Sequence, residues 1–191
     1  MKLNKSVVER RVKLMEEEGV VFRLNTEVGK DLSALDLMNQ FDAVLLCIGS
    51  TVPRPLQAEG ASLKGVHYAV PFLSANTKSL LDSQLEDGNY ISAKGKHVVI
   101  IGGGDTGTDC VATSIRHGAT SVTQLEIMGE PPLCRTEQNP WPQYPRIKKT
   151  DYGQEEAITL FGQDPRKYLT TVTKLSGNEK GEVKEVHTVQ V

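Results

Sequence analysis

The sequence predicts an α/β fold in which helices alternate with the strands of a parallel sheet. The first observation is a series of strand, glycine-rich turn, helix and strand over residues 97–127, with Gly118 ending the helix. The second is the apolar run 42–48, closed by Gly49, because nearly continuous apolar runs suit strands buried on both faces of a parallel sheet. Together they predict a Rossmann-like domain of three layers.

The N-terminal quarter of the chain is expected to alternate in the same way. Ser6 and Glu9 are spaced as a capping box, and Gly19 supplies a stop, so a helix is predicted over 6–18. The β-branched and aromatic run 20–24 predicts a strand. A further helix is expected over 32–38.

The remaining segments are assigned from turn residues and periodicity. Proline and glycine make 50–61 a crossover between two units, and five prolines make 129–145 a loop. A β-hairpin is predicted at the C-terminal end, because two strand-like runs flank the polar, glycine-containing segment 176–181. The other predicted elements are short helices over 78–85 and 151–161 and the hairpin strands 168–175 and 182–191.

Composition excludes several classes of protein. The net charge is -2 and the basic residues are scattered, so the chain has no sign of a nucleic-acid-binding protein. No apolar run approaches the roughly 20 residues that span a bilayer. No apolar segment follows the first five residues, so they are not expected to begin a signal peptide, and a cytoplasmic location without membrane attachment is predicted.

The chain has three widely spaced cysteines and no Cys-x-x-Cys pattern. This excludes a disulfide scaffold, a zinc ribbon and an iron–sulfur cluster held by this chain alone. The four histidines have no metal-ligand spacing, so no metal site is predicted. The cysteines and histidines are Cys47, Cys110, Cys134, His67, His97, His117 and His187.

The turn after the strand 97–101 has the spacing Gly-x-Gly-x-x-Gly. Gly102 permits the sharp turn out of the strand, Gly104 lets a pyrophosphate approach the backbone, and Gly107 lets the following helix pack close to the strand. The helix N-terminus then offers free N–H groups and a positive dipole end to phosphates. Because the required strand and helix flank the turn, it is predicted to be a dinucleotide site rather than a purely structural turn.

Three further residues of the turn have expected roles. Gly103 belongs to the tight loop, and the backbone N–H groups near Asp105 and Thr106 are expected to contact the ligand. A carboxylate beside a pyrophosphate would be repelled, so the Asp105 side chain is expected to turn away and cap the helix.

Two residues beyond the turn bear on the choice of cofactor. Glu126 ends the second strand, where an acidic group meets the ribose 2′-hydroxyl of NADH and disfavours the 2′-phosphate of NADPH. Arg135, in the next loop, could instead pair with that phosphate. The sequence leans to NADH and leaves the choice open.

No catalytic residue is predicted. The chain has no Gly-x-Ser-x-Gly and no paired carboxylates that stand out. Hydride transfer to a flavin needs no protein acid or base, since the cofactors carry the chemistry and the protein positions them. The lack of catalytic groups is therefore compatible with a nucleotide-binding half of a reductase.

Two segments resemble the small (beta) chain of glutamate synthase. The run 98–110 resembles its NAD(P)H site, and the more distinctive combination is Asn139-Pro140-Trp141-Pro142-Gln143-Tyr144-Pro145 followed by 150–157. Leu125 and Glu126 match one branch of that family, and the similarity covers essentially the whole chain. The resemblance implies a two-nucleotide, FAD/NAD(P)-binding flavoprotein fold.

The resemblance also implies a function. NAD(P)H would reduce FAD, and electrons would pass through iron–sulfur clusters to the large (alpha) subunit, where glutamine and 2-oxoglutarate yield glutamate. The family's cysteine-rich segment and FAD-binding glycine turn are not in this sequence, and residues 1–14 resemble the interior of the family's chain. Residues 1–50 are therefore expected to be an edge of the FAD domain and 51–191 the NAD(P)H-binding domain, without FAD binding or turnover by this piece alone.

Two other functions remain open. A sister flavoprotein of the same architecture would be a ferredoxin–NADP reductase of the electron-bifurcating kind or a dihydropyrimidine dehydrogenase, in which the tryptophan–proline run of 139–157 is not expected. A non-catalytic nucleotide-binding module would keep the glycine turn without a redox role.

Overall fold

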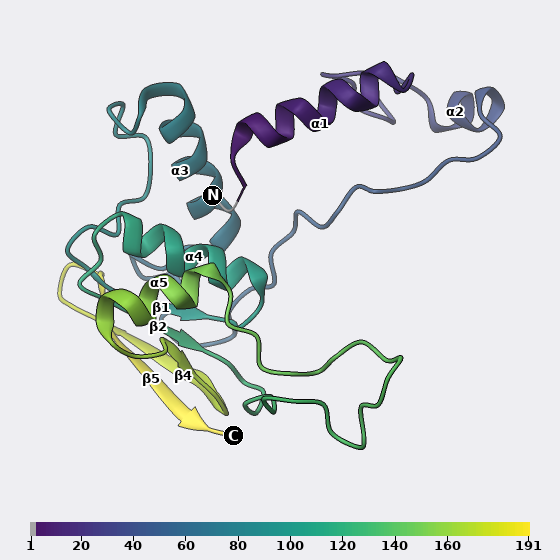
Figure 1. The fold of residues 1–191 in the computed structure, drawn as a ribbon. Coiled ribbons are helices and arrows are strands. Elements are labelled where there is room, and N and C mark those ends of the chain that lie inside the picture. Colours follow the sequence, from purple (N-terminus) through teal and green to yellow (C-terminus); the bar gives the residue numbers. More distant parts are fainter. Residues whose placement is uncertain (1–2) are drawn as a thin grey trace. The chain divides into compact units, whose positions relative to one another are not determined.

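The computed structural model describes residues 3–191, which divide into two compact units, Leu3–Arg54 and Pro55–Val191 (Figure 1). The smaller unit contains α1 (Lys5–Glu17) and α2 (Ala34–Gln40). Each helix begins at a polar N-cap whose side-chain oxygen accepts a backbone N–H, from Ser6 at Asn4 and from Leu35 at Ser33. Both helices are close to their predicted positions, but Asn4, and not Ser6, caps α1.

The strands predicted at 20–24 and 42–48 are not formed. Both runs are extended segments without ladder hydrogen bonds, and their apolar side chains are exposed, with Val21 at 81% and Leu45 at 87%. A strand needs a neighbour to accept and donate its backbone hydrogen bonds. None of the segments described within Leu3–Arg54 supplies one, so the apolar pattern is present without the sheet that would bury it.

The larger unit is built on a parallel sheet in the order β1-β2-β3. β1 (His97–Ile101) and β2 (Ser121–Leu125) are joined through α4 (Asp105–Arg116), as predicted. They pair in register from His97 opposite Ser121 to Ile101 opposite Leu125. The two-residue β3 (Arg166–Lys167), which was not predicted, pairs with the end of β2.

Two more helices and a hairpin complete this unit. α3 (Ala69–Ser83) begins earlier than the predicted helix over 78–85 and is longer. α5 (Tyr152–Phe161) begins at a capping box formed by Asp151 and Gln154. The predicted hairpin is confirmed as antiparallel β4 (Thr170–Gly177) and β5 (Val183–Gln190).

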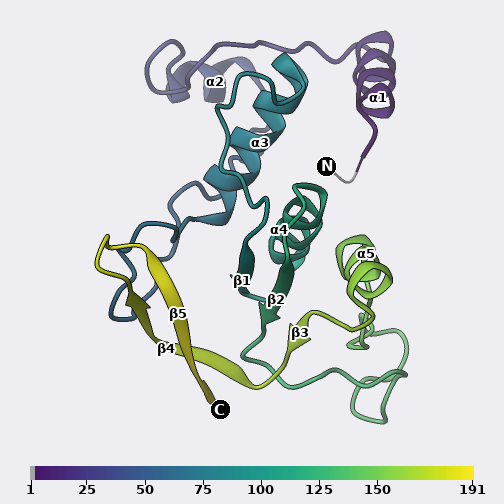
Figure 2. The same ribbon diagram turned by 90° about the vertical axis from the view of Figure 1, so that its left-hand side faces the viewer.

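The parallel sheet has an apolar core on each face. Ile100 and Val122 pack with Val111 of α4 and Ala157 of α5, whereas Leu125 packs with the hairpin. Figure 2 shows β1 and β2 between the helices α4 and α5 and the hairpin β4–β5. The predicted three-layer, Rossmann-like α/β fold is therefore confirmed for this unit. Among residues 3–191, no helix is long and apolar enough to cross a membrane.

Candidate nucleotide-binding site

The glycine-rich turn joins the carboxyl end of β1 to the N-terminus of α4. Gly102 has a φ of +124°, a conformation that side chains rarely adopt, and its N–H donates to the Leu125 carbonyl at 2.9 Å. Gly104 is the N-cap of α4, and a Cβ added there would meet no atom within 4 Å. The protein therefore leaves open space directly over the first turn of α4, where unpaired N–H groups and the helix dipole favour an anion.

Gly107 is constrained by packing inside the protein. A Cβ at this position would overlap the Gly102 carbonyl and would lie 2.7 Å from Nε2 of Gln124. Only glycine lets the first turn of α4 approach β1 and β2 this closely. The two glycines therefore differ, since Gly104 faces open space and Gly107 faces the core of the fold.

Glu126 lies against the turn. A Cβ added to Gly103 would overlap its carboxylate, and Oε1 of Glu126 accepts a hydrogen bond of 2.9 Å from the N–H of Met128. The structure thus brings the acidic residue at the end of β2 next to the glycine turn. Its second carboxylate oxygen, Oε2, is the one that faces Gly103.

Asp105 and Thr106 begin α4. The expectation that Asp105 caps this helix is wrong, because Gly104 occupies the N-cap and no side-chain cap bond is made there. The Asp105 carboxylate lies instead in the first turn, where a negative charge is favoured by the helix dipole.

A pocket of about 180 Å³ opens beside Gly103 and Glu126. Its wall includes three basic residues and one aromatic residue, and the complete lining is Gly103, Glu126, Met128, Gly129, Pro131, Lys148, Lys149, Arg166 and Tyr168. The pocket adjoins the carboxyl ends of the parallel strands, which is where ligands bind in open α/β sheets.

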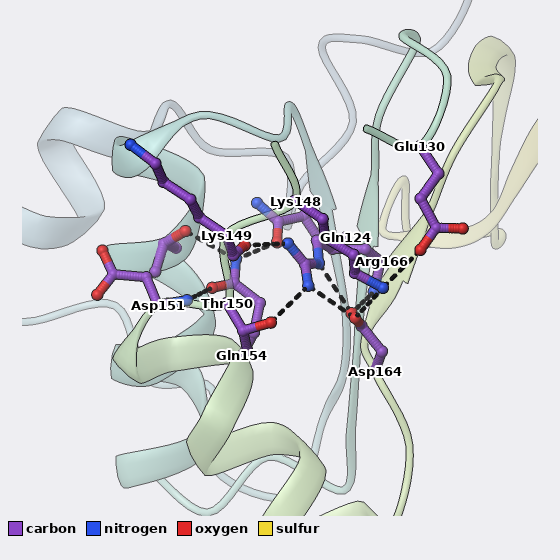
Figure 3. Close-up of polar contacts among 10 residues, drawn as sticks. Gln124, Glu130, Lys148, Lys149, Thr150, Asp151, Gln154, Asp164 and Arg166 are labelled. Carbon is purple, nitrogen blue, oxygen red and sulfur yellow. Dashed lines mark hydrogen bonds and ion pairs between the residues drawn. The ribbon is translucent and has the colours of Figure 1, made fainter. Parts of the chain in front are cut away.

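The cations of this wall already have partners within the protein. Lys148 contacts Glu130 at 2.5 Å and Asp164 at 3.4 Å, and Arg166 contacts Asp164 at 2.7 Å (Figure 3). Burial opposes ionisation of Asp164, but the hydrogen bonds from Arg166 outweigh it and lower the pKa of Asp164 to about 2. Arg166 also donates to the Lys149 carbonyl at 2.7 Å, which ties β3 to the segment before α5.

Arg135 lies in the proline-rich loop and is not among the residues that line this pocket. Its guanidinium donates to the carbonyls of Asn139 and Gln143, at 3.2 and 2.8 Å, and lies 5.9 Å from the centre of the Trp141 ring. Asn139 is 5% exposed and bonds to the Tyr144 carbonyl, so the loop is organised by its own polar contacts.

Two buried glutamines that were not predicted as site residues form hydrogen bonds on the interior side of the turn. Gln124 of β2 is fully buried, and its Nε2 donates to the Gly102 carbonyl at 2.9 Å. Gln154 of α5 is 2% exposed, and its Nε2 donates to Gln124 and to Thr108 at 2.9 and 2.8 Å. The signal that could have revealed Gln124 is a polar residue inside an otherwise buried strand.

Comparisons with known proteins identify the family of this chain. The family model described as pyridine nucleotide-disulphide oxidoreductase matches residues 7–140, a stretch that includes the glycine turn and Glu126. The chain belongs to this family. The resemblance stated from the sequence and the predicted Rossmann-like fold are confirmed by membership of the pyridine nucleotide-disulphide oxidoreductase family and by the relatives below.

Several glutamate synthases are similar to this member of the family over its whole length. "Glutamate synthase [NADH]" of Schizosaccharomyces pombe is 53% identical over all of this chain, which covers 9% of that protein. "Glutamate synthase [NADPH] small chain" of Bacillus subtilis is 49% identical, again over all of this chain, which covers 39% of that protein. The chain thus spans well under half the length of these relatives. The name of the first relative includes NADH, and the name of the second includes NADPH.

The turn and α4 of this pyridine nucleotide-disulphide oxidoreductase family member carry hydrogen-bonding groups and one buried thiol. The turn offers backbone N–H groups, and Glu126 offers a hydrogen-bond acceptor. The thiol of Cys110 is buried in α4, where desolvation and the charge of Asp109 raise its pKa to about 11. A thiol with so high a pKa is a poor nucleophile. Within residues 3–191, no group of three or more His, Cys, Asp or Glu side chains could hold a metal ion.

Proposed function

We propose that this chain is the NAD(P)H-binding part of a glutamate synthase and that its glycine turn binds the pyrophosphate of the cofactor. The observation that carries this proposal is the open space over Gly104 at the N-terminus of α4. The backbone N–H groups of 103–106 would hold the phosphates there, with the positive end of the α4 dipole behind them. This assigns the cofactor site to Gly102, Gly103, Gly104, Asp105 and Thr106, with Gly107 packing α4 close to the strands behind it.

The ribose of the adenosine half would be held by Glu126. Its Oε2 faces the turn at Gly103, and the pocket that it lines continues toward Tyr168. A carboxylate there accepts a hydrogen bond from a ribose hydroxyl and repels a 2′-phosphate, which supports NADH. The loop contacts of Arg135 favour Glu126 over Arg135 as the residue that selects the cofactor.

The reaction of the whole protein follows from its similarity to glutamate synthases. When both cofactors are bound, the nicotinamide supplies a hydride to FAD. This chain's own residues bind and orient the nicotinamide nucleotide, and none is assigned a proton-transfer step. FAD and iron–sulfur clusters would belong to the full-length protein, from which electrons would reach the large (alpha) subunit for formation of glutamate from glutamine and 2-oxoglutarate, in the cytoplasm.

The two parts of the chain would then have different roles. Residues 51–191 would be the NAD(P)H-binding domain, and residues 1–50 an edge of the FAD-binding domain. The exposed apolar runs 20–24 and 42–48 support the second assignment, since such runs are buried when neighbouring strands are present. This chain alone is expected to bind no FAD and to turn over no substrate, and flavin absorbance that co-purifies with it would contradict that expectation.

The test is titration of the 191-residue chain with NADH and with NADPH by calorimetry. Dissociation constants in the micromolar-to-millimolar range are expected, with NADH binding more tightly. Gly104→Val should abolish binding and leave the circular dichroism spectrum unchanged, because a Cβ there meets no protein atom within 4 Å and would stand where the phosphates are proposed to bind. Ser33→Val places a valine at the N-cap of α2, a helix outside the site, and should leave binding unchanged. Equal binding by wild type and Gly104→Val would refute the proposed site.

A further inference from the structure

The buried glutamines form a hydrogen-bond chain that runs in one direction. The N–H of Asp151 donates to Oε1 of Gln154 at 3.1 Å, and Nε2 of Gln154 donates to Oε1 of Gln124 at 2.9 Å. Nε2 of Gln124 then donates to the carbonyl of Gly102 at 2.9 Å. Three hydrogen bonds therefore connect the N-terminus of α5 to the first residue of the glycine turn (both glutamines are labelled in Figure 3).

The orientation of both amides is determined by the two ends of this chain. A backbone N–H can only donate, so the oxygen of Gln154 must face Asp151, and a carbonyl can only accept, so the nitrogen of Gln124 must face Gly102. If either amide were rotated by half a turn, two oxygens or two N–H groups would face each other inside the protein. Such an unsatisfied buried contact is unfavourable, so the amides hold one arrangement.

This arrangement also determines where the next backbone N–H points. The peptide bond between Gly102 and Gly103 is trans, so its C=O and N–H point in opposite directions. Because Gln124 holds the Gly102 carbonyl toward the interior, the N–H of Gly103 points the opposite way, out of the interior. Among residues 3–191, no acceptor takes a hydrogen bond from this N–H.

Without these restraints, the Gly102–Gly103 peptide could rotate about its flanking backbone dihedral angles. Gly102 has no side chain to restrict it, and glycine samples both signs of φ readily. Packing supports the same restraint as the hydrogen bond, since a Cβ on Gly107 would overlap the Gly102 carbonyl and would lie 2.7 Å from Nε2 of Gln124. The turn is thus held by the Gln124 amide, by the close approach of α4 at Gly107, and by the N–H of Gly102, which donates to the Leu125 carbonyl.

We infer that Gln124 and Gln154 are positioning residues that orient the Gly102–Gly103 peptide so that its N–H can bind a phosphate oxygen of the cofactor. The inference rests on the proposed function, because it presumes that a pyrophosphate binds at the turn. Neither side chain touches the ligand in this arrangement. Gln154 acts on the site only through Gln124. An experiment can use this dependence to distinguish a positioning role from a general effect on folding.

The first test replaces each glutamine and measures NADH binding to the 191-residue chain. Gln124→Leu is expected to raise the dissociation constant about tenfold, the effect of losing about 1.4 kcal/mol of binding. Gln154→Glu places a carboxylate against Oε1 of Gln124 and should weaken binding by a similar factor. In the double variant the second change should add little, because its route to the turn has been removed.

The second test uses pH within one variant. Burial raises the pKa of a carboxyl, and the carboxyl introduced by Gln154→Glu can donate to Gln124 only when protonated. The affinity of the Gln154→Glu variant for NAD⁺, which carries the same pyrophosphate as NADH, should therefore improve by several fold relative to wild type when the pH is lowered from 8 to 5.5. Gln163→Glu makes the same change at an exposed position just after α5 and should follow wild type.

The outcomes separate the inference from the proposed function. Wild type that binds neither NADH nor NADPH would overturn both. Wild type that binds, with Gln124→Leu and Gln154→Glu variants that are folded by circular dichroism and bind equally well, would overturn the inference alone. If Gln124→Leu does not fold, the pH series on Gln154→Glu decides, and an affinity that follows wild type at every pH would overturn the inference.

Discussion

The carboxylate of Glu126 occupies the position that a side chain on Gly103 would take. The absence of a Cβ on Gly103 therefore makes room for the charged carboxylate of Glu126, which follows β2. The same carboxylate is held by the N–H of Met128 at 2.9 Å, so it keeps a hydrogen bond to the backbone without a ligand.

This contact predicts that Glu126 controls the choice between NADH and NADPH. Glu126→Gln keeps the size of the side chain and removes the charge that would repel a 2′-phosphate. Binding of NADPH relative to NADH is expected to improve about tenfold, which corresponds to about 1.4 kcal/mol. Calorimetric titration with both cofactors measures the ratio. Glu137→Gln changes the same charge in the exposed loop and is the control. An unchanged ratio would show that Glu126 does not face the 2′ position.

A second prediction concerns the contact between α4 and α5. A Cβ on Gly153 would overlap the Thr108 carbonyl and would lie 3.3 Å from the N of Ala112, both backbone groups of α4. Gly153→Ala should therefore lower the free energy of unfolding by about 1–3 kcal/mol, the usual cost of overpacking. Helix propensity alone predicts the opposite sign, because alanine is favoured over glycine in helices by about 1 kcal/mol.

Urea unfolding monitored by circular dichroism measures this change. Thr159→Ala at an exposed position of the same helix is the control and should change stability little. A Gly153→Ala variant that is more stable than wild type would mean that α5 does not approach α4 this closely.

A third prediction concerns Asp164, whose pKa is lowered to about 2 from 3.8, with burial opposing and Arg166 favouring the charged form. A depressed folded-state pKa adds stability above the unfolded value of 3.8 that is lost as pH falls toward 2. The shift corresponds to about 2 kcal/mol at neutral pH. Asp164→Asn should lose about this much at pH 7, and the difference from wild type in urea unfolding should shrink below pH 4. A constant difference across that range would contradict the assignment.

Local pattern was sufficient for β1, the glycine turn, α4 and β2. The apolar run, the glycine spacing and the final Gly118 each act within a few residues, so they can be recognised without knowledge of the rest of the fold. The hairpin β4–β5 was predictable for the same reason, because its turn residues separate two strand-like runs.

Features that depend on distant partners were not predictable. β3 has only two residues and is defined by pairing with β2, so it shows no periodicity of its own. Gln124 and Gln154 are 30 positions apart and meet only in the folded protein. The apolar run 42–48 was wrongly predicted as a strand because the pattern reports a surface that can be buried, whereas a strand also requires a neighbour.

The last prediction concerns His117, the C-cap of α4. Its Nδ1 accepts the N–H of Ala93 at 3.3 Å, and its Nε2 lies 2.5 Å from Oδ1 of Asn76. Because Ala93 N can only donate, Nδ1 carries no proton, and Nε2 is the donor to Asn76. The neutral ring therefore uses both nitrogens, and it makes T-shaped contacts with the rings of Phe72 and Tyr90.

Desolvation lowers the pKa of His117 below 6.5 in the folded protein. As pH falls through 6.5, the unfolded chain takes up a proton that the folded chain does not, so stability should fall until pH reaches the folded-state pKa. The contribution of His117 to the change in the free energy of unfolding is at most about 1.4 kcal/mol per pH unit. Urea unfolding of wild type between pH 7.5 and 5.5 measures it. His117→Gln should be less stable at pH 7.5 but should lose less stability on acidification. His67→Gln, at an exposed position, should keep the wild-type slope. If His117→Gln and wild type had equal slopes, His117 would not be the group responsible.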